Sequence, residues 1–163
     1  MFQVARVALS VFLVACELCA TAWGEKPSKV EIGKRGKAAT AFVEVPGRGS
    51  GTGFCVHSLE LFVTNEHVIR DAEKADIIVV LEPSHANQRE FKPAVVRIDK
   101  ETDLALLRIE GVDDLPSLTL GSINGIAELA EVIACGFPLI RKLSTDKQEY
   151  PAISVNGGSV TAL

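Results

Sequence analysis

The feature that most limits the fold of this chain is a succession of short apolar runs separated by turn residues. Runs rich in Val, Ile, Leu and Phe are bounded by Gly, Pro, Asn or Asp about every eight to twelve residues, and no convincing long helix interrupts them. Such spacing predicts an all-β sandwich or barrel. The predicted strands cover residues 37–45, 54–56, 61–64, 76–81, 91–98, 104–109 and 127–136, with one or two more between 150 and 163.

The turn signals divide the chain into a leader and two units. Residues 25–36 are polar and are predicted to lead into the first unit. Residues 37–122 form a first unit that looks complete, whereas residues 127–163 begin a second unit of about three strands and then stop. A second sheet of that size would leave strand edges unpaired.

Two of the connections carry distinct patterns. Residues 46–53 alternate glycine with other residues and are predicted to be a turn, because glycine adopts positive φ without strain. No helix with a Lys-Ser/Thr pair follows, so this stretch does not match a phosphate-binding loop. Residues 68–74 are predicted to form a short helical turn.

Composition excludes several classes of protein. The chain has 163 residues, of which 47% are hydrophobic and 23% charged, so it should bury a core and is not a disordered segment. Its net charge of −4 is dispersed along the sequence. This balance argues against nucleic acid or an anionic membrane surface as a partner.

The first 24 residues have the layout of a secretory signal peptide. Arg6 precedes a nine-residue apolar run at 7–15, and small residues follow at 20–24. Cleavage after a small-x-small site is one interpretation. The alternative is lipoprotein processing, since residues 13–16 (Leu-Val-Ala-Cys) resemble a lipobox that would place a lipid on Cys16. Either route predicts an exported protein of the periplasm or cell envelope, and a lipid on Cys16 would be its only membrane attachment. An uncleaved anchor or a misassigned start is the competing explanation.

Of the four cysteines, Cys16 and Cys19 lie in this export segment, which leaves Cys55 and Cys135 in apolar surroundings. Buried free cysteine behaves as a small hydrophobe, although an exported protein could also form a disulfide. No Cys-x-x-Cys or Cys/His cluster indicates zinc, so no metal and no cofactor are predicted.

One histidine and one aspartate stand in positions that suggest chemistry. His67 directly follows an apolar strand and a Thr-Asn-Glu turn, and Asp103, 36 residues later, directly precedes another apolar strand. This arrangement is typical of the base and the orienting acid of a serine-protease triad in the order His, Asp, Ser. Taken alone, each residue would be read as an exposed histidine or a turn-capping acid, and only their pairing favours catalysis.

Four segments in order give the chain a family resemblance. They are residues 49–54 (Gly-Ser-Gly-Thr-Gly-Phe), 63–69 (Val-Thr-Asn-Glu-His-Val-Ile), 102–107 (Thr-Asp-Leu-Ala-Leu-Leu) and 135–138 (Cys-Gly-Phe-Pro). Together they resemble the HtrA/Deg branch of the trypsin-like serine proteases. Phe137 departs from the Gly-Asn-Pro turn of that family, which affects a turn and not the chemistry.

The resemblance implies a trypsin-like double β-barrel with the active site between two six-stranded barrels, the first essentially complete here and the second truncated. It implies His67 as general base, Asp103 as its orienting partner, polypeptides as substrates and no cofactor. It also allows a homo-oligomer, since trimers are common in the resembling family.

The nucleophile is unknown. No Gly-x-Ser-Gly-Gly segment occurs, and the glycines beside Ser159 precede it, so it does not fit a nucleophile loop. The leading hypothesis is therefore an exported HtrA-like serine endopeptidase present as a fragment, which lacks its serine and is inactive alone. The alternative is a non-enzymatic, protease-like module that binds peptides, or a relic.

Overall fold

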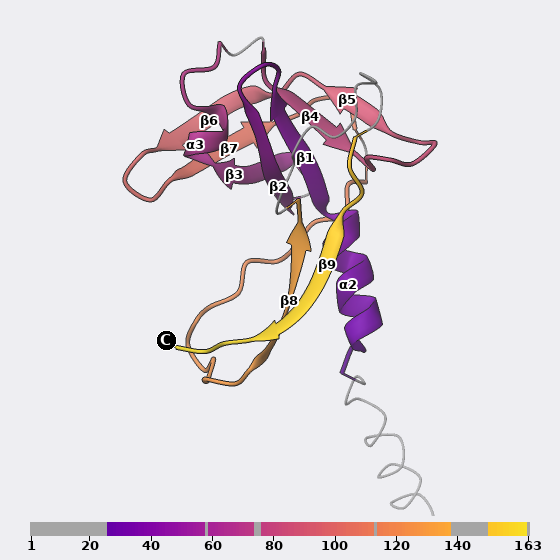
Figure 1. The fold of residues 1–163 in the computed structure, drawn as a ribbon, viewed down its shortest axis with the longest axis vertical. Helices are drawn as coiled ribbons and strands as arrows, with labels where there is room; N and C mark the ends of the chain where they lie inside the picture. Colours follow the sequence, from indigo (N-terminus) through magenta and orange to yellow (C-terminus); the bar gives the residue numbers. More distant parts are fainter. Residues whose placement is uncertain (1–25, 58, 74–75, 113, 138–149, 163) are drawn as a thin grey trace, which may run out of the picture.

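Seven antiparallel strands form one sheet that curls on itself (Figure 1). The computed structural model describes residues 26–57, 59–73, 76–112, 114–137 and 150–162, so the predicted signal peptide and Cys16 lie outside the described residues. The sheet order is β5-β4-β1-β2-β3-β7-β6. The strands are β1 (Thr40–Val45), β2 (Gly49–His57), β3 (Leu61–Asn65), β4 (Ile78–Leu81), β5 (Arg89–Phe91), β6 (Ala94–Asp99) and β7 (Leu104–Arg108).

The two ends of this sheet are consecutive in the sequence. β5 pairs with β4 and β6 pairs with β7, yet only Lys92 and Pro93 separate β5 from β6. One segment thus bends from one edge of the sheet to the other. Pro93 explains the break between β5 and β6, where the sequence pattern predicted a single strand at 91–98, because proline cannot donate a ladder hydrogen bond.

Alternating side chains of β1 contribute to two apolar clusters. Ala41, Val43 and Val45 are 0–2% exposed and face the main core, together with Phe62, Leu107 and Ile109. On the other face, Phe42 packs against Phe137 and Tyr150, with ring centroids 5.1 and 5.4 Å apart. Each fully buried Val, Leu, Ile or Phe side chain contributes about 1.5–3 kcal/mol to folding. The all-β prediction is confirmed.

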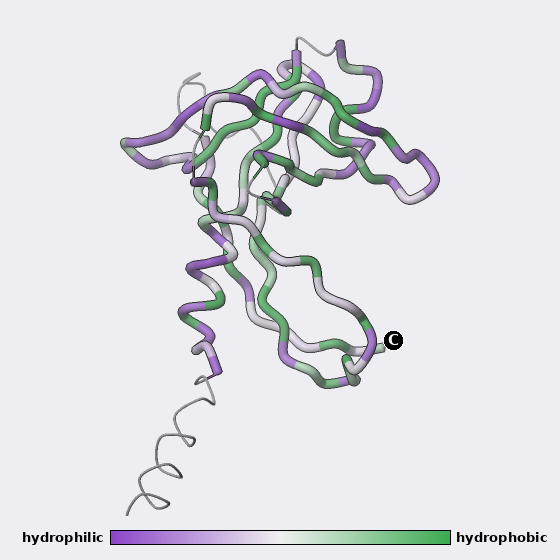
Figure 2. Tube along the Cα trace, turned by 180° about the vertical axis from the view of Figure 1, so that it is seen from behind, coloured by the Kyte–Doolittle hydropathy of each residue, from purple (hydrophilic) through white to green (hydrophobic). Residues whose placement is uncertain are grey.

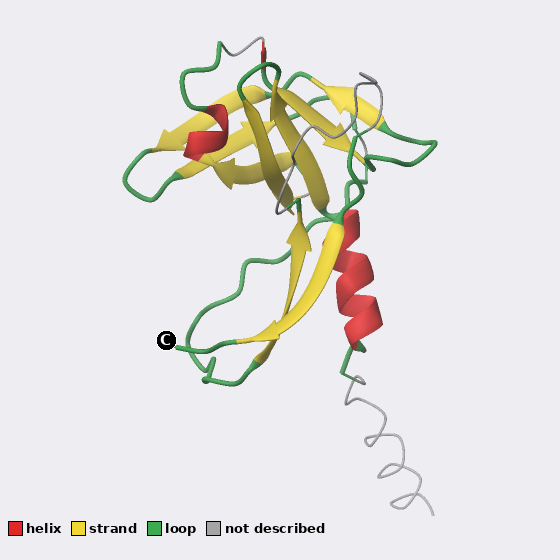
Figure 3. Ribbon diagram, in the orientation of Figure 1, coloured by secondary structure: helices red, strands yellow, loops and turns green. Residues whose placement is uncertain are grey.

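A separate hairpin and a helix extend from one end of the curled sheet (Figure 3). The hairpin consists of β8 (Glu131–Gly136) and β9 (Ser154–Ser159), which pair along their whole length. Helix α2 (Lys29–Ala38) lies beside it. Figure 2 shows α2 as mostly hydrophilic and the hairpin as largely neutral to hydrophobic. Within the described ranges, no helix is long and apolar enough to cross a membrane.

Helix α2 occupies residues that the sequence pattern assigned to an irregular leader and to the start of a strand. Ser28 caps it in a capping box with Glu31, and Arg35 and Lys37 lie in its last turn, where cations are favoured. β1 consequently begins at Thr40 rather than at Lys37.

The glycine-rich stretch also differs from its prediction. Only Gly47 has positive φ (78°), and β2 already begins at Gly49. The later glycines therefore belong to a strand and not to a turn. The helical turn predicted at residues 68–74 is displaced, because α3 (Glu66–Ile69) shares only residues 68 and 69 with that range.

Candidate active site

The pairing of β3 with β7 brings His67 and Asp103 together. Asn65, the last residue of β3, lies opposite Leu104, the first residue of β7. The residues just beyond this pair therefore share one end of the sheet. The Nδ1 atom of His67 lies 2.7 Å from Oδ2 of Asp103.

Asp103 is held by several donors besides the imidazole. Its Oδ1 accepts the backbone N–H of His67 at 2.9 Å, and its Oδ2 accepts the side-chain amide of Asn65 at 3.2 Å. Its carbonyl oxygen accepts the backbone N–H of Glu66 at 3.1 Å. Asp103 adopts positive φ (53°), a conformation that Asp tolerates better than most residues. Its pKa is lowered, first by the backbone hydrogen bond from His67 and then by the side chain of His67.

This geometry determines which ring nitrogen of His67 carries the proton. An ionised carboxylate can only accept hydrogen bonds, so Nδ1 of His67 must be the protonated nitrogen when it bonds to Asp103. In neutral His67 the lone pair is then on Nε2, which makes no hydrogen bond with any described residue. The side chain of His67 is 58% exposed, so Nε2 is free to accept a proton from another group.

The β6–β7 turn that presents Asp103 is closed by Asp99. Its Oδ1 accepts the backbone N–H groups of Glu101 and Thr102, both at 3.1 Å. These bonds, that of Thr102 foremost, lower the pKa of Asp99. The carboxylate thus orders the turn in the manner of an Asx motif.

Helix α3, which carries His67, is seated on β2 and on the β1–β2 turn. A Cβ at Gly51 would lie 2.6 Å from Cγ2 of Val68, so only glycine leaves room for this helix on the strand. Just after the helix, the carbonyl of Asp71 accepts a hydrogen bond from the guanidinium of Arg48 at 2.5 Å.

Comparison with known proteins identifies the fold and the family. Residues 51–163 match the trypsin-like peptidase domain. The chain belongs to this family. The structure is similar to a solved structure of the HtrA-type protease AlgW with a tripeptide, with a TM-score of 0.67 and 28% identity, covering 83% of this chain and 40% of that chain.

The similar curated proteins place this member of the trypsin-like peptidase family in its HtrA-like branch. Serine protease HTR4 from Rattus norvegicus is 33% identical over 112 residues, which are 69% of this chain and 22% of that protein. A probable periplasmic serine endoprotease DegP-like from Rickettsia prowazekii is 38% identical over 88 residues, 54% of this chain and 16% of that protein. The HtrA/Deg resemblance is thus confirmed, and the chain spans about a fifth of the length of these relatives.

The serine considered in the sequence lies far from the histidine of this HtrA-like chain. Gly157, Gly158 and Ser159 belong to β9, and Ser159 pairs with Glu131 at the carboxyl end of that strand. This end of the hairpin points away from the curled sheet that carries α3 (Figure 1). Ser159 is therefore not a partner of His67 in this structure.

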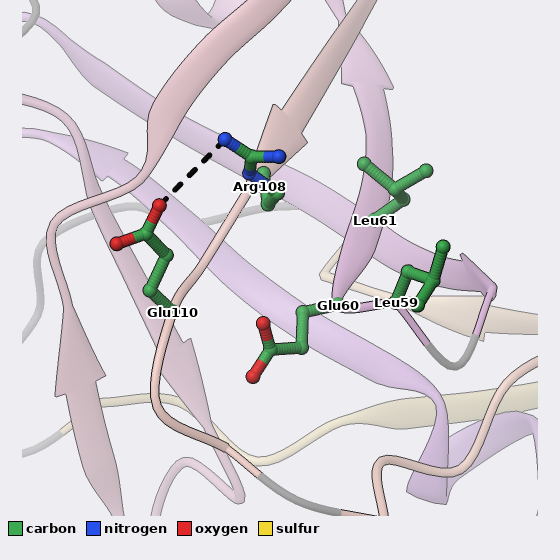
Figure 4. A pocket seen from close by; sticks show the side chains of 5 residues that line it. All are labelled: Leu59, Glu60, Leu61, Arg108 and Glu110. Carbon is green, nitrogen blue, oxygen red and sulfur yellow. Dashed lines mark ion pairs between the residues drawn. The ribbon is translucent and has the colours of Figure 1, made fainter.

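One surface depression of this HtrA-like chain does not adjoin the histidine. It encloses about 350 Å³ and is lined by Leu59, Glu60, Leu61, Arg108 and Glu110 (Figure 4). Leu61 begins β3 and Arg108 ends β7, so the depression lies at the opposite end of these strands from His67 and Asp103. It is not a substrate cleft for that pair.

Three residues around His67 were not singled out in the sequence. Asn65 bonds to Asp103, and Glu66 forms an ion pair with Arg70. The polar run of Asn65 and Glu66 before a histidine was a usable signal for the first two. The role of Arg70 needed knowledge that α3 is a helix, because only helical spacing brings positions 66 and 70 together.

Proposed function

We propose that this chain carries the proton-transfer residues of an exported HtrA-type serine endopeptidase. The observation that supports this proposal is the 2.7 Å contact of His67 with Asp103, which directs the free nitrogen of the imidazole outward. His67 would be the general base and Asp103 the residue that orients it.

The reaction would follow the acyl-enzyme route. Nε2 of His67 takes the proton of a serine hydroxyl while the oxygen of that serine attacks the peptide carbonyl. The same nitrogen then gives the proton to the leaving amine, and a second cycle with water releases the acyl group. Throughout, Asp103 holds the Nδ1–H and stabilises the imidazolium by its negative charge.

The nucleophile is proposed to come from residues other than these 163. No serine of the sequence stands in a Gly-x-Ser-Gly-Gly context, and none among the described residues bonds to His67. We therefore expect the 163-residue chain to hydrolyse no peptide bond by itself. Incubation with a fluorophosphonate probe, followed by mass spectrometry, tests this, and a covalent adduct on any serine of the chain would contradict it.

The enzyme assignment itself is tested on a longer gene product. If the coding DNA continues past the codon of Leu163 into a Gly-x-Ser-Gly-Gly segment, the longer protein should acylate with the same probe. Replacement of His67 by alanine should then slow acylation by about 10⁴-fold or more, as removal of a triad base does. Equal labelling of both proteins would exclude His67 as the base.

The cellular location is part of the proposal. Residues 1–24 would be a signal for export to the periplasm or cell envelope, and a probable periplasmic serine endoprotease is among the similar proteins. Metabolic labelling with a radioactive fatty acid distinguishes the two routes of processing, because a Cys16→Ser variant loses the label only if Cys16 is lipidated. Analytical ultracentrifugation of the mature protein tests the proposed homo-oligomer.

A peptide-binding module is the second candidate. β8 and β9 pair with no third strand in the part of the chain that the structure describes, and Val132 and Val155 are 45% and 42% exposed. An extended peptide could add to such an edge. Calorimetry with an extended peptide and with the same peptide carrying prolines at alternate positions tests this, since the prolines remove the ladder donors.

A further inference from the structure

The residue directly before His67 is a buried carboxylate. The side chain of Glu66 is only 2% exposed, and Glu66 is the one acidic or basic residue that is buried among the described residues. Its Oε2 accepts two hydrogen bonds from Arg70, from Nε at 2.8 Å and from a terminal guanidinium nitrogen at 2.5 Å. Arg70 directly follows the helix and is 54% exposed.

Both members of this pair are charged. The hydrogen bond from Arg70 lowers the pKa of Glu66, and the same bond raises the pKa of Arg70. Lys100 and Asp103 are the other charged groups that act on Glu66. A buried charge is costly unless it is paired and hydrogen-bonded, so the guanidinium is needed to keep the Glu66 carboxylate in place.

Helix α3 cannot hold its own shape. It contains four residues, a single turn, and isolated helices of this length are not stable in water. Two of its backbone N–H groups, those of Glu66 and His67, donate to Asp103. The ion pair spans the helix from its first residue to the residue after its last, so it closes the turn whose N–H groups face Asp103.

We propose that the Glu66–Arg70 pair is a clamp that fixes α3 and thereby positions the His67 imidazole on Asp103. Glu66 and Arg70 are positioning residues in this proposal, because neither touches the reacting atoms. The inference rests on the proposed role of His67 as base, but its test reads the hydrogen bond between His67 and Asp103 directly and needs no peptidase activity.

The test uses nuclear magnetic resonance of the ¹⁵N-labelled 163-residue chain. Its readouts are the downfield resonance of the His67 Nδ1–H, the exchange rate of this proton with water and the tautomer of the ring. Arg70→Gln removes the counter-charge, and Glu66→Gln removes the buried charge while it keeps the size of the side chain. Arg108→Gln is the matched control, because it breaks the exposed pair of Arg108 with Glu110 at 3.6 Å at the far end of β7.

The clamp predicts that exchange of the His67 Nδ1–H rises about tenfold or more in Arg70→Gln, as local opening of α3 would cause. Glu66→Gln should raise the exchange rate of the His67 Nδ1–H by a smaller factor. Arg70→Lys should exchange more slowly than Arg70→Gln, and the control Arg108→Gln should exchange at the wild-type rate. If Arg70→Gln does not fold, Glu66→Gln decides alone. Wild-type exchange and an unchanged Nδ1–H tautomer in a folded Arg70→Gln or Glu66→Gln variant would overturn the clamp. Absence of the Nδ1–H resonance in the wild type would instead count against the proposed function.

Discussion

Gly51 of β2 lies directly under Val68 of α3, so close that a Cβ at position 51 would approach Cγ2 of Val68 to 2.6 Å and Cγ1 to 3.2 Å. Valine is stiff about χ1 and cannot easily swing away. Helix α3, which carries His67, can therefore pack this closely on β2 because residue 51 has no side chain.

We expect Gly51→Ala to destabilise the protein by about 1–3 kcal/mol, the usual cost of overpacking. Chemical denaturation measures this cost. Gly49→Ala is the matched control on the same strand, because a Cβ at Gly49 would meet nothing within 4 Å. Equal stability of the two variants would show that α3 moves freely on β2.

Asp103→Asn tests what the carboxylate does for the imidazole. The variant keeps the size of the side chain but can donate as well as accept, so the Nδ1–H tautomer of His67 should lose its preference. Nitrogen chemical shifts of the ring report this change. In an active longer product the same variant should lower kcat by about 10⁴-fold, the effect seen when a triad aspartate is replaced by asparagine. A tautomer identical to that of the wild type would refute the orienting role.

The lowered pKa of Asp103 makes the stability of the protein depend on pH in the acid range. Because the folded pKa lies below the unfolded value of about 3.9, the ionised carboxylate stabilises the fold above that pH and the contribution is lost as the pH falls through the folded pKa. Denaturation of the wild type and of Asp103→Asn at several pH values should show a difference that shrinks below about pH 4. A difference independent of pH would mean that the charge of Asp103 does not matter to folding.

Tyr150 offers a spectroscopic test of the second apolar cluster. Burial, together with a hydrogen bond to Glu90, raises its pKa to about 12. Since it is the only tyrosine, the absorbance of tyrosinate should report this midpoint directly. Because the folded pKa lies above the unfolded value, protonated Tyr150 stabilises the fold fully below about pH 10. This contribution is lost as the pH rises through the folded pKa. A midpoint near 10 would show that Tyr150 does not pack against Phe42.

Two glycines of α2 should respond differently to alanine. A Cβ at Gly36 would lie 2.6 Å from Sγ of Cys135, whereas one at Gly33 would meet Val155 at an ordinary 3.4 Å. Alanine stabilises a helix by about 1 kcal/mol relative to glycine, so Gly33→Ala should stabilise the protein and Gly36→Ala should lose that gain to the clash. Alkylation of Cys135, followed by mass spectrometry, should be faster in Gly36→Ala. Identical rates in both variants would mean that α2 does not cover this thiol.

The contact of His67 with Asp103 could be foreseen because it follows from strand pairing. Each residue adjoins the end of a recognisable apolar strand, and antiparallel pairing of these strands leaves little freedom in where the two meet. The helical conformation of Glu66 and the positive φ of Asp103 could not be foreseen, since both depend on hydrogen bonds between distant segments.

Two of the wrong predictions, the irregular leader at residues 25–36 and the turn at residues 46–53, have one physical origin, which is close packing around glycine. Helix α2 contacts the hairpin through Gly33 and Gly36, so it lacks the apolar stripe by which amphipathic helices are recognised, although its capping box was visible. Likewise, Gly51 and Gly53 occupy a strand because the side chains of Val68 and Val43 fill the space beside them. In both places glycine allows close packing of neighbouring elements and does not form a turn.

The continuity of β5 and β6 has a mechanical consequence. A cut between Phe91 and Ala94 would remove the covalent link between β5 and β6, which are the two edge strands of the sheet. β7, which directly follows Asp103, lies next to the edge strand β6, whereas β3, which leads into the helix of His67, lies one strand further from that edge. Proteolytic cleavage between β5 and β6 would therefore allow the β6–β7 hairpin, whose turn carries Asp103, to fray before β3 separates from the sheet.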